Sequence, residues 1–291
     1  MRFDDKVIFI TGGGSGLGRE CALWWAGAGG KIVVTDIVEK RATDVAAQIS
    51  ADGGTAIGLK VDVSKESEVA EAVDQTIETF GQLDVMFANA GKTQAGGGAI
   101  RLDELTDEQF DDVVDVLFKG VFYCGKHAAR VMKPAGKGNI VVTTSSAALF
   151  AFPGFGAYCG AKAGAVGLIR SMAYEFGGYG IRCNGIAPMF GMSVNFPLDP
   201  LADVVGLSYE EAALAESGDK WDPNTMFPSP LKLNRPPSLR DNAAVATFLA
   251  SDYSEYLSGA VLPSCDGGAF ARISIPFPEG WTVTDQVSSG S

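Results

Sequence analysis

The sequence predicts an α/β protein, a single doubly wound (Rossmann-type) parallel sheet with helices on both faces. Three observations predict it. Short apolar runs rich in β-branched residues alternate with segments of helical period, a glycine-rich turn follows the first run, and no repeat or long linker divides the 291 residues. Strands separated by helices require right-handed crossovers, which make neighbouring strands parallel and cover both faces of the sheet. A chain of this length can bury a sizeable core in one domain.

The predicted strands are seven apolar runs: Lys6–Thr11, Lys31–Thr35, Ala56–Val61, Leu83–Ala88, Asn139–Ser145, Ile181–Ala187 and Ala260–Pro263. The predicted helices between them include Gly16–Ala28, Lys40–Ile49, Glu66–Thr79, Thr106–Met132 and Ala157–Phe176. Thr106 and Gln109 have the spacing of a capping box, which supports a helix that begins at this threonine.

Composition excludes several classes of protein. A formal charge of −12 argues against a nucleic-acid partner, because phosphates require a basic surface. The five cysteines are scattered and never form Cys-x-x-Cys, so we expect free thiols in a reducing compartment. The N-terminus lacks the apolar stretch of a signal peptide, and no apolar run approaches membrane-spanning length. We therefore expect a cytoplasmic protein without a membrane partner.

The chain has a single histidine, His127. Without a second histidine or clustered cysteines we predict no metal site. A Ser-His hydrolase would need His127 and a Gly-x-Ser-x-Gly turn, which the sequence lacks. We interpret His127 as a residue on a helix surface.

The first strand–helix turn contains TGGGSGLG, Thr11 to Gly18, with glycines at 12, 16 and 18. Glycines allow the backbone to turn tightly and approach a diphosphate, and the helix N-terminus offers free N–H groups and a positive dipole end. Such a loop alone is weak evidence, but its place between the first strand and first helix is typical of a dinucleotide site.

Asp36 ends the second predicted strand, eighteen residues after Gly18. A carboxylate there can accept hydrogen bonds from the adenosine ribose and would repel the extra phosphate of NADP. No lysine or arginine occurs at 13–15 or 37–39 to reverse that preference. The loop and Asp36 together predict NAD as the cofactor.

Seven motifs then occur in a fixed order along the chain. They are Gly12-x-x-x-Gly16-x-Gly18, Asp62-Val63, Asn89-Ala90-Gly91, Ser145 thirteen residues before a tyrosine, Tyr158-x-x-x-Lys162, Asn184 with Pro188, and Asp266-Gly267-Gly268. In this respect residues 5 to 268 resemble the short-chain dehydrogenase/reductase family, in its shorter, classical branch. A Tyr-x-x-x-Lys alone has little weight, whereas seven motifs in register are highly specific.

The resemblance implies roles for individual residues. Asp62 would accept from the adenine amine, Val63 would flank the ring, and Asn89, Ala90 and Gly91 would pass the adenosine ribose. Pro188 to Ser193 would hold the nicotinamide carboxamide. The cofactor-binding residues expected on this basis are Gly12, Ser15, Gly16, Leu17, Gly18, Asp36, Ile37, Asp62, Val63, Asn89, Ala90, Gly91, Tyr158, Lys162, Pro188, Met189, Gly191 and Ser193.

The family's catalytic residues would be Ser145, Tyr158 and Lys162, and the spacing to the tyrosine selects Ser145 over Ser146. Oxidation of a secondary alcohol needs a base for the hydroxyl proton, and a free phenol with a pKa of about 10 is too weakly ionised. A lysine ammonium one turn away and the positive nicotinamide would both lower the phenol's pKa. Ser145 would orient the substrate oxygen and stabilise its developing charge.

Two positions depart from the family pattern. Leu117 replaces an asparagine associated with a distorted helix turn and a water relay to the lysine, so a backbone carbonyl or another route must serve that relay. Met189 stands where the family often has glycine, and puts an apolar side chain near the nicotinamide.

We expect one cofactor-binding domain over 1–268, with an insertion at about 190–237 as a substrate lid, and a tail at 269–291. The aromatic and methionine residues of the insertion either line a substrate pocket or pack the lid on the body. The tail packs on the body or on a neighbouring subunit. These features predict an NAD(H)-dependent dehydrogenase of a small hydrophobic, cyclic or aromatic secondary alcohol or the matching ketone.

Steroids, terpenoid alcohols and aromatic dihydrodiols are all candidate substrates, and the sequence does not rank them. The alternative, motivated by Leu117, is a catalytically weak NAD(H)-binding sensor or scaffold. By resemblance to the family we also expect a homo-oligomer, a tetramer or a dimer, built through the two long helices.

Overall fold

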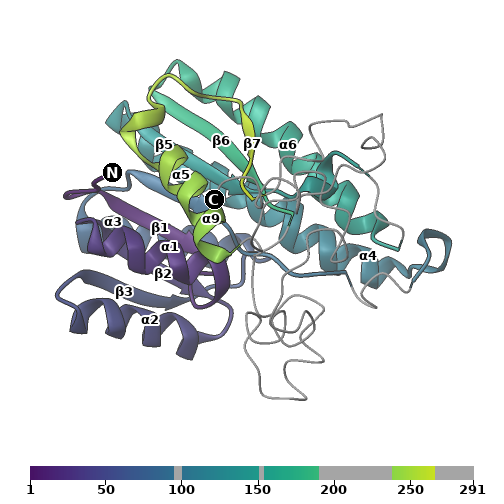
Figure 1. Ribbon diagram of the computed structural model, residues 1–291, viewed down its shortest axis with the longest axis horizontal. Helices are drawn as coiled ribbons and strands as arrows, with labels where there is room; N and C mark the ends of the chain where they lie inside the picture. Colours follow the sequence, from purple (N-terminus) through teal and green to yellow (C-terminus); the bar gives the residue numbers. More distant parts are fainter. Residues whose placement is uncertain (95–99, 151–153, 190–237, 266–291) are drawn as a thin grey trace, which may run out of the picture.

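The computed structural model describes residues 1–94, 100–150, 154–189 and 238–265. Within these residues seven parallel strands form one sheet in the order β3-β2-β1-β4-β5-β6-β7 (Figure 1). The strands are β1 (Val7–Thr11), β2 (Lys31–Asp36), β3 (Thr55–Lys60), β4 (Val85–Ala88), β5 (Gly138–Thr143), β6 (Ile181–Ala187) and β7 (Val261–Pro263). The chain winds outward from β1 in both directions, which confirms the doubly wound α/β fold.

Alternate residues of the central strand β1 pack on opposite faces of the sheet, as the period of two requires. Val7 and Phe9 belong to an apolar cluster with α3, α5 and α6, and Ile8 and Ile10 belong to another with α1, α2 and α9. The helices are α1 (Gly16–Gly27), α2 (Glu39–Ala51), α3 (Glu66–Phe80), α4 (Asp107–Val114), α5 (Gly120–Ala135), α6 (Gly156–Gly177) and α9 (Leu239–Ala250). Both faces are covered, which explains why the strands are apolar at successive positions.

The helix predicted over Thr106–Met132 is interrupted in the structure. A capping box starts α4, since Thr106 Oγ1 accepts from the Gln109 N–H at 3.3 Å and Gln109 Oε1 accepts from the Thr106 N–H at 3.1 Å. A π-helical turn, η2 (Asp115–Lys119), then separates α4 from α5, and the N–H of Gly120 bonds to the carbonyl of Asp115. Helical periodicity did not reveal the single residue that a π turn adds, although the resemblance to the family associates the position of Leu117 with a distorted turn.

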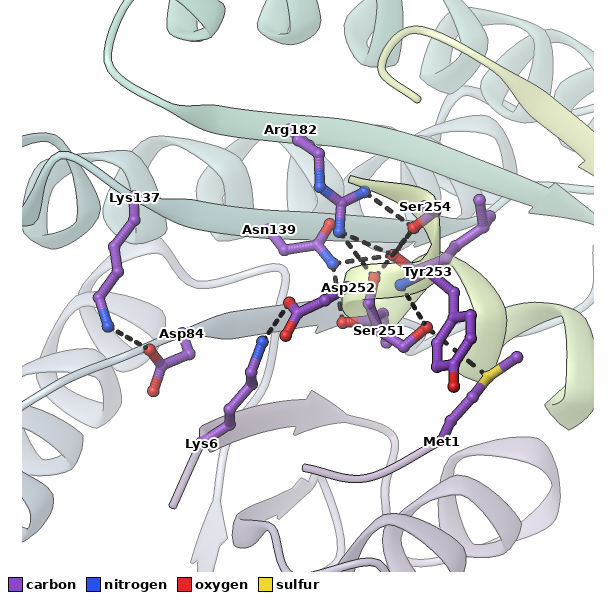
Figure 2. Close-up of polar contacts among 12 residues, drawn as sticks. Met1, Lys6, Asp84, Lys137, Asn139, Arg182, Ser251, Asp252, Tyr253 and Ser254 are labelled. Carbon is purple, nitrogen blue, oxygen red and sulfur yellow. Dashed lines mark hydrogen bonds and ion pairs between the residues drawn. The ribbon is translucent and has the colours of Figure 1, made fainter. Parts of the chain in front are cut away.

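Helix α9 was not among the predicted elements. It begins at a capping box between Ser238 and Asp241, whose carboxylate accepts from the Ser238 N–H at 2.8 Å. At its other end, Asn139 Nδ2 donates to the carbonyls of Leu249 and Ala250 at 2.8 and 3.0 Å (Figure 2). These bonds satisfy carbonyls that a helix end leaves without partners.

Arg182, on β6, reinforces the same helix end from the neighbouring strand. Its guanidinium donates to the carbonyls of Leu249 and Ser251 at 3.3 and 3.1 Å, and to Ser254 Oγ at 3.0 Å (Figure 2). Partial burial lowers the pKa of this arginine from its ordinary value. The starts of β5 and β6 are thus bonded directly to the C-terminus of α9.

The single histidine is not on the surface, contrary to the prediction. His127 lies in α5, but its side chain is buried where α5 packs on α3, and Nε2 is 3.2 Å from Glu66 Oε1. Among the described residues no three His, Cys, Asp or Glu side chains gather as they would around a metal ion.

No helix in the described part of the chain is both long enough and apolar enough to cross a bilayer. The predicted lid at 190–237 and tail at 269–291 lie outside the described residues, as does the motif at 266–268.

Candidate active site

A cleft of about 590 Å³ lies at the carboxyl ends of the strands on both sides of β1. This is where a doubly wound sheet binds ligands, because the crossovers diverge at the point where the strand order reverses. The predicted residues that line the cleft are Gly12, Ser15, Gly16, Leu17, Asp36, Ile37, Asp62, Val63, Asn89, Ala90, Gly91, Tyr158 and Lys162.

The glycine-rich turn forms one wall of the cleft. Gly12 and Gly16 have φ of +62° and +50°, a region that favours glycine. A Cβ at Gly18 would lie 2.2 Å from the carbonyl oxygen of Gly12, so this glycine permits close helix–turn packing. Helix α1 starts at Gly16 without a side-chain cap from Ser15, and its first N–H groups have no partner within the helix. The wall therefore has the donors that a dinucleotide diphosphate needs.

Asp36 lies at the end of β2 and is 5 % exposed. Its carboxylate accepts from the N–H of Gly14 at 3.2 Å and from that of Val38 at 3.0 Å. These bonds fix the carboxylate between the glycine-rich turn and the start of α2, at the cleft wall where the sequence predicted an adenosine ribose.

Arg41 also lines this end of the cleft and was missed by the sequence analysis. A Cβ at Gly14 would lie 2.5 Å from Arg41 Cβ and 2.8 Å from Asp36 Oδ2, so the three residues are in close contact. Basic residues were sought at 13–15 and 37–39, but the first turn of α2 brings residue 41 back beside the loop. A helix that begins at Glu39 places residue 41 in its first turn, so this start of the helix would have predicted the position of Arg41.

Asn89, at the end of β4, connects three strands. Its Nδ2 donates to the carbonyl of Thr11 at 3.1 Å, and its Oδ1 accepts from Thr143 Oγ1 at 3.0 Å. Its backbone N–H donates to Thr11 Oγ1 at 2.9 Å. This buried network holds the ends of β1, β4 and β5 together and so fixes the floor of the cleft.

Asp62 and Val63 follow β3 and line the cleft, where the sequence predicted the adenine. Asp62 Oδ1 accepts from the N–H of Ser64 at 2.9 Å and from its hydroxyl at 2.7 Å, a turn that orients the carboxylate. Val63 is buried, and a Cβ at Gly120 would lie 3.0 Å from its methyl group. The glycine at the start of α5 therefore lets Val63 pack against that helix.

Tyr158 and Lys162 lie one turn apart on the buried face of α6. Tyr158 is 8 % and Lys162 is 4 % exposed, and Lys162 Nζ is 5.9 Å from the centre of the phenol ring. Lys162 Nζ donates to the carbonyl of Thr143 at 2.8 Å. Ser145 follows β5 by two residues, accepts from the N–H of Ala147 at 3.1 Å and hydrogen-bonds to Tyr158. The structure thus brings the three predicted catalytic residues together.

The charges of this trio are strongly affected by burial. Burial raises the pKa of Tyr158 to about 12, although the hydrogen bond from Ser145 acts in the opposite direction. Burial also lowers the pKa of Lys162 to about 8. The sequence analysis expected a lowered phenol pKa. Without a cofactor the pKa of Tyr158 is raised instead, because the phenolate loses more stabilisation from water on burial than the protein groups return to it.

Leu117 lies in the π turn and is 1 % exposed. Its Cδ2 would be 3.4 Å from a Cβ at Gly91, so it packs against the cofactor-facing segment after β4. The turn is distorted without the asparagine with which the family's distortion is associated. Leu117, which motivated the sensor alternative, therefore does not remove the distorted backbone of this turn.

The structure describes two of the residues predicted to hold the nicotinamide, Pro188 and Met189. Pro188 accepts from the N–H of Ser146 at 2.9 Å, which joins the end of β6 to the segment after Ser145. The N–H of Met189 donates to Cys265 Sγ at 3.2 Å. Gly191 and Ser193 lie outside the described residues.

Comparisons with known proteins agree with this geometry. The family model for short chain dehydrogenase matches residues 6–193. Secoisolariciresinol dehydrogenase from Forsythia intermedia is 38% identical over 267 residues, 92% of this chain and 90% of that protein. Momilactone A synthase from Oryza sativa subsp. japonica is 38% identical over 265 residues, 90% of this chain and 89% of that protein.

Two solved structures have the same arrangement of elements. Levodione reductase superposes with a TM-score of 0.78 at 31% identity, covering 93% of this chain and all (100%) of that one. A 7α-hydroxysteroid dehydrogenase in complex with NADH and 7-oxo glycochenodeoxycholic acid gives 0.75 at 30% identity, with 92% and 95% covered. The chain is an oxidoreductase of the short-chain dehydrogenase/reductase family.

Proposed function

We propose that the protein is an NAD(H)-dependent oxidoreductase that transfers a hydride between nicotinamide and a hydrophobic, cyclic or aromatic secondary alcohol or ketone. The observation that carries the proposal is the placement of Tyr158 and Lys162 at one end of a cleft with Asp36 at the other, together with the hydrogen bond between Ser145 and Tyr158. Membership of a family that uses nicotinamide cofactors supports the reaction class.

In this proposal Tyr158 accepts the proton from the hydroxyl oxygen of the alcohol, while a hydride leaves the carbon atom that bears this hydroxyl. An oxidised nicotinamide held in the cleft would supply the hydride acceptor and a positive charge near the phenol. Ser145 donates a hydrogen bond to the substrate oxygen, and Lys162 stabilises the phenolate. Because burial raises the pKa of Tyr158 to about 12, the protein groups alone hold it as a neutral phenol. Tyr158 then becomes an effective base only when the oxidised cofactor is bound.

The preference for NAD(H) over NADP(H) rests on Asp36. Its buried carboxylate lines the cleft, and a negative group there would repel a ribose phosphate. Arg41 is close by and could pair with the same phosphate, so the selectivity is the difference between these two charges. Asp36 is the more buried of the two, where a charge is less screened, and we propose that it prevails.

The hydrophobic substrate is supported by the described surroundings of Tyr158. The phenol belongs to an apolar cluster with Leu117 and Ala147, and Phe155 packs against it with ring centres 6.2 Å apart. Leu149, four residues after Ser145, is 46 % exposed. A related structure is of a hydroxysteroid dehydrogenase, an enzyme whose name denotes a polycyclic alcohol. We also propose that the segment 190–237 serves as the substrate lid.

A panel of apolar secondary alcohols with NAD⁺, followed by nicotinamide absorbance, tests the proposal. We expect turnover of cyclic alcohols, with little turnover when NADP⁺ replaces NAD⁺. Tyr158→Phe should lower kcat by about 10²- to 10⁴-fold, as expected for loss of a general base, and should leave NADH binding intact. Binding of NADH without hydride transfer to any member of the panel, in either direction, would overturn the proposal.

A further inference from the structure

The helix that carries Tyr158 begins without a cap from its own sequence. Helix α6 starts at Gly156, and Phe155, the residue before it, makes no side-chain cap. The first N–H groups of a helix have no partner within it, and an adjacent Ser, Thr, Asp or Asn commonly accepts from them. In a buried helix start these donors need another acceptor.

Gln94, more than sixty residues earlier, supplies that acceptor. Its Oε1 accepts from the N–H of Ala157 at 3.0 Å and from the N–H of Tyr158 itself at 3.2 Å. Its Nε2 donates to the carbonyl of Gly154 at 2.6 Å. The side chain is 1 % exposed, so water does not compete for these bonds. One amide thus holds the loop before α6 and the first turn of α6 in a fixed relation.

The chain segment directly before Gln94 lines the cleft. Gln94 follows the segment Asn89–Thr93, all five residues of which line the cleft. Asn89 and Ala90 are themselves fixed, since both N–H groups donate to Thr11 Oγ1 at 2.9 Å. A single side chain therefore connects a segment anchored to β1 with the backbone of the predicted base.

We propose that Gln94 is a positioning residue for Tyr158, which sets the distance between the phenol and the cofactor-lining segment. The inference rests on the proposed function, because it assigns Gln94 a part in that reaction. A displacement of about 1 Å between reacting groups can lower a rate by about 100-fold. The amide is suited to the task because it offers an acceptor for two N–H groups and a donor for one carbonyl.

Two substitutions at Gln94 separate these contacts. Gln94→Met keeps the length of the side chain and removes all three hydrogen bonds. Gln94→Glu keeps the oxygen that accepts from Ala157 and Tyr158. Its second oxygen replaces the NH₂ group beside the Gly154 carbonyl, and can donate to that carbonyl only when the carboxyl is protonated. We expect Gln94→Met to lower kcat by about 10- to 100-fold while KM for NAD⁺ and the Kd of NADH stay within about twofold. Gln94→Glu should recover at least about tenfold of that loss.

Asn139→Leu is the matched control. Asn139 is also a buried amide that bonds to helix-end backbone groups, but these belong to α9 and lie at the amino end of β5, away from the cleft. It should lower the thermal unfolding midpoint as Gln94→Met does, with kcat within about twofold of the parent. Hydrogen exchange of the peptide that contains Ala157 and Tyr158 should become faster in Gln94→Met and remain slow in Asn139→Leu.

The outcomes distinguish this inference from the proposed function. An active parent protein whose kcat is unchanged by Gln94→Met overturns the inference alone. Equal losses of kcat in Gln94→Met and Gln94→Glu, or a comparable loss in Asn139→Leu, also overturn it, because the effect then does not follow the bonds to α6. A parent protein that turns over no alcohol overturns the proposed function first, and the inference with it.

Discussion

Tyr158 is the residue whose pKa should change when the cofactor binds. Burial raises its pKa to about 12 in the protein alone, and burial lowers that of Lys162 to about 8. A positive nicotinamide near the phenol favours the phenolate, so we expect NAD⁺ to lower the pKa of Tyr158. The base acts in its deprotonated form. Alcohol oxidation should therefore speed up as the pH rises towards this lowered pKa. Ketone reduction uses the protonated phenol in the NADH complex, so it should slow down only at a higher pH, near the pKa of that complex.

The measurement is the phenolate absorbance of the protein minus that of Tyr158→Phe, which removes the signal of the other six tyrosines. NADH is the matched ligand control, since its nicotinamide ring is neutral and should lower the pKa less than NAD⁺ does. An equal Tyr158 midpoint with NAD⁺ and with NADH would contradict the proposed role of the ring charge.

Asp36 and Arg41 give a second prediction for single residues. Asp36→Ala should narrow the preference for NAD(H) by at least about tenfold, because the carboxylate is lost while Arg41 remains to pair with the ribose phosphate. Adding Arg41→Ala to that variant should weaken NADP(H) binding again and change NAD(H) binding little. Titration of the parent protein and of both variants with NADH and with NADPH measures the six affinities. Equal affinity of the parent protein for both cofactors would refute the assignment of Asp36.

These residues also show what the sequence could and could not predict. Tyr158, Lys162 and Asp36 follow fixed spacings from strands and glycines, so motifs located them and the structure places them around one cleft. Arg41 and Gln94 belong to no motif. They reach the site through contacts with Gly14 and with the start of α6, and such tertiary contacts leave no periodic trace in the sequence.

Among the elements, the π turn between α4 and α5 has the clearest consequence. The N–H of Gly120 bonds to the carbonyl of Asp115 within this turn, and Leu117 packs into the apolar cluster that contains Tyr158. Apolar periodicity correctly predicted helices on both sides, but it merged them, because a π turn shifts the pattern by a single residue. The turn keeps its distorted backbone with leucine, so backbone carbonyls remain the available polar groups for a proton relay.

Leu117→Asn tests that relay. We expect kcat to change by less than about tenfold, or about 1.4 kcal/mol of barrier, because a backbone carbonyl and a water can conduct the proton almost as well as an amide. The variant should unfold more easily, by about 1–3 kcal/mol, since an amide replaces a side chain that is 1 % exposed. Steady-state kinetics and denaturant unfolding measure both effects. Activity that appears only in Leu117→Asn would favour the sensor or scaffold alternative.

At the scale of the whole molecule, the winding of the sheet explains why the motifs meet. Seven parallel strands direct their carboxyl ends to one edge, so glycines after β1, Asp36 at the end of β2 and Asn89 after β4 converge despite their separation in sequence. The alternation of apolar runs and helical segments was sufficient to predict a doubly wound parallel sheet, but not the order of its strands. A homo-oligomer was predicted from the resemblance to the family. The surfaces of α5 and α6 indicate which side chains are exposed for such an interface.

Gly125 of α5 and Gly164 of α6 are packed against side chains of this chain, whereas Gly167 of α6 is exposed and a Cβ there would meet no described atom within 4 Å. A Cβ at Gly125 would lie 2.2 Å from Met172 Sδ, and one at Gly164 would lie 2.9 Å from the ring of Phe118. Large apolar side chains of the same two helices are exposed. Phe122 on α5 is 45 % exposed and Tyr174 on α6 is 91 % exposed. A contiguous apolar patch marks a surface where proteins associate, and these two side chains lie on helices that pack against each other.

We propose a closed homo-oligomer, a tetramer or a dimer, that buries these helix faces. Light scattering at micromolar concentration should give a multiple of the 30.4 kDa chain mass, and Phe122→Glu should shift it towards the monomer, because association would bury an unpaired charge. Val38→Glu is the matched control, since Val38 is 42 % exposed but precedes α2, away from α5 and α6. It should leave the mass unchanged. A monomeric parent protein would contradict the proposal, and equal dissociation by both substitutions would show that the interface does not follow these helices.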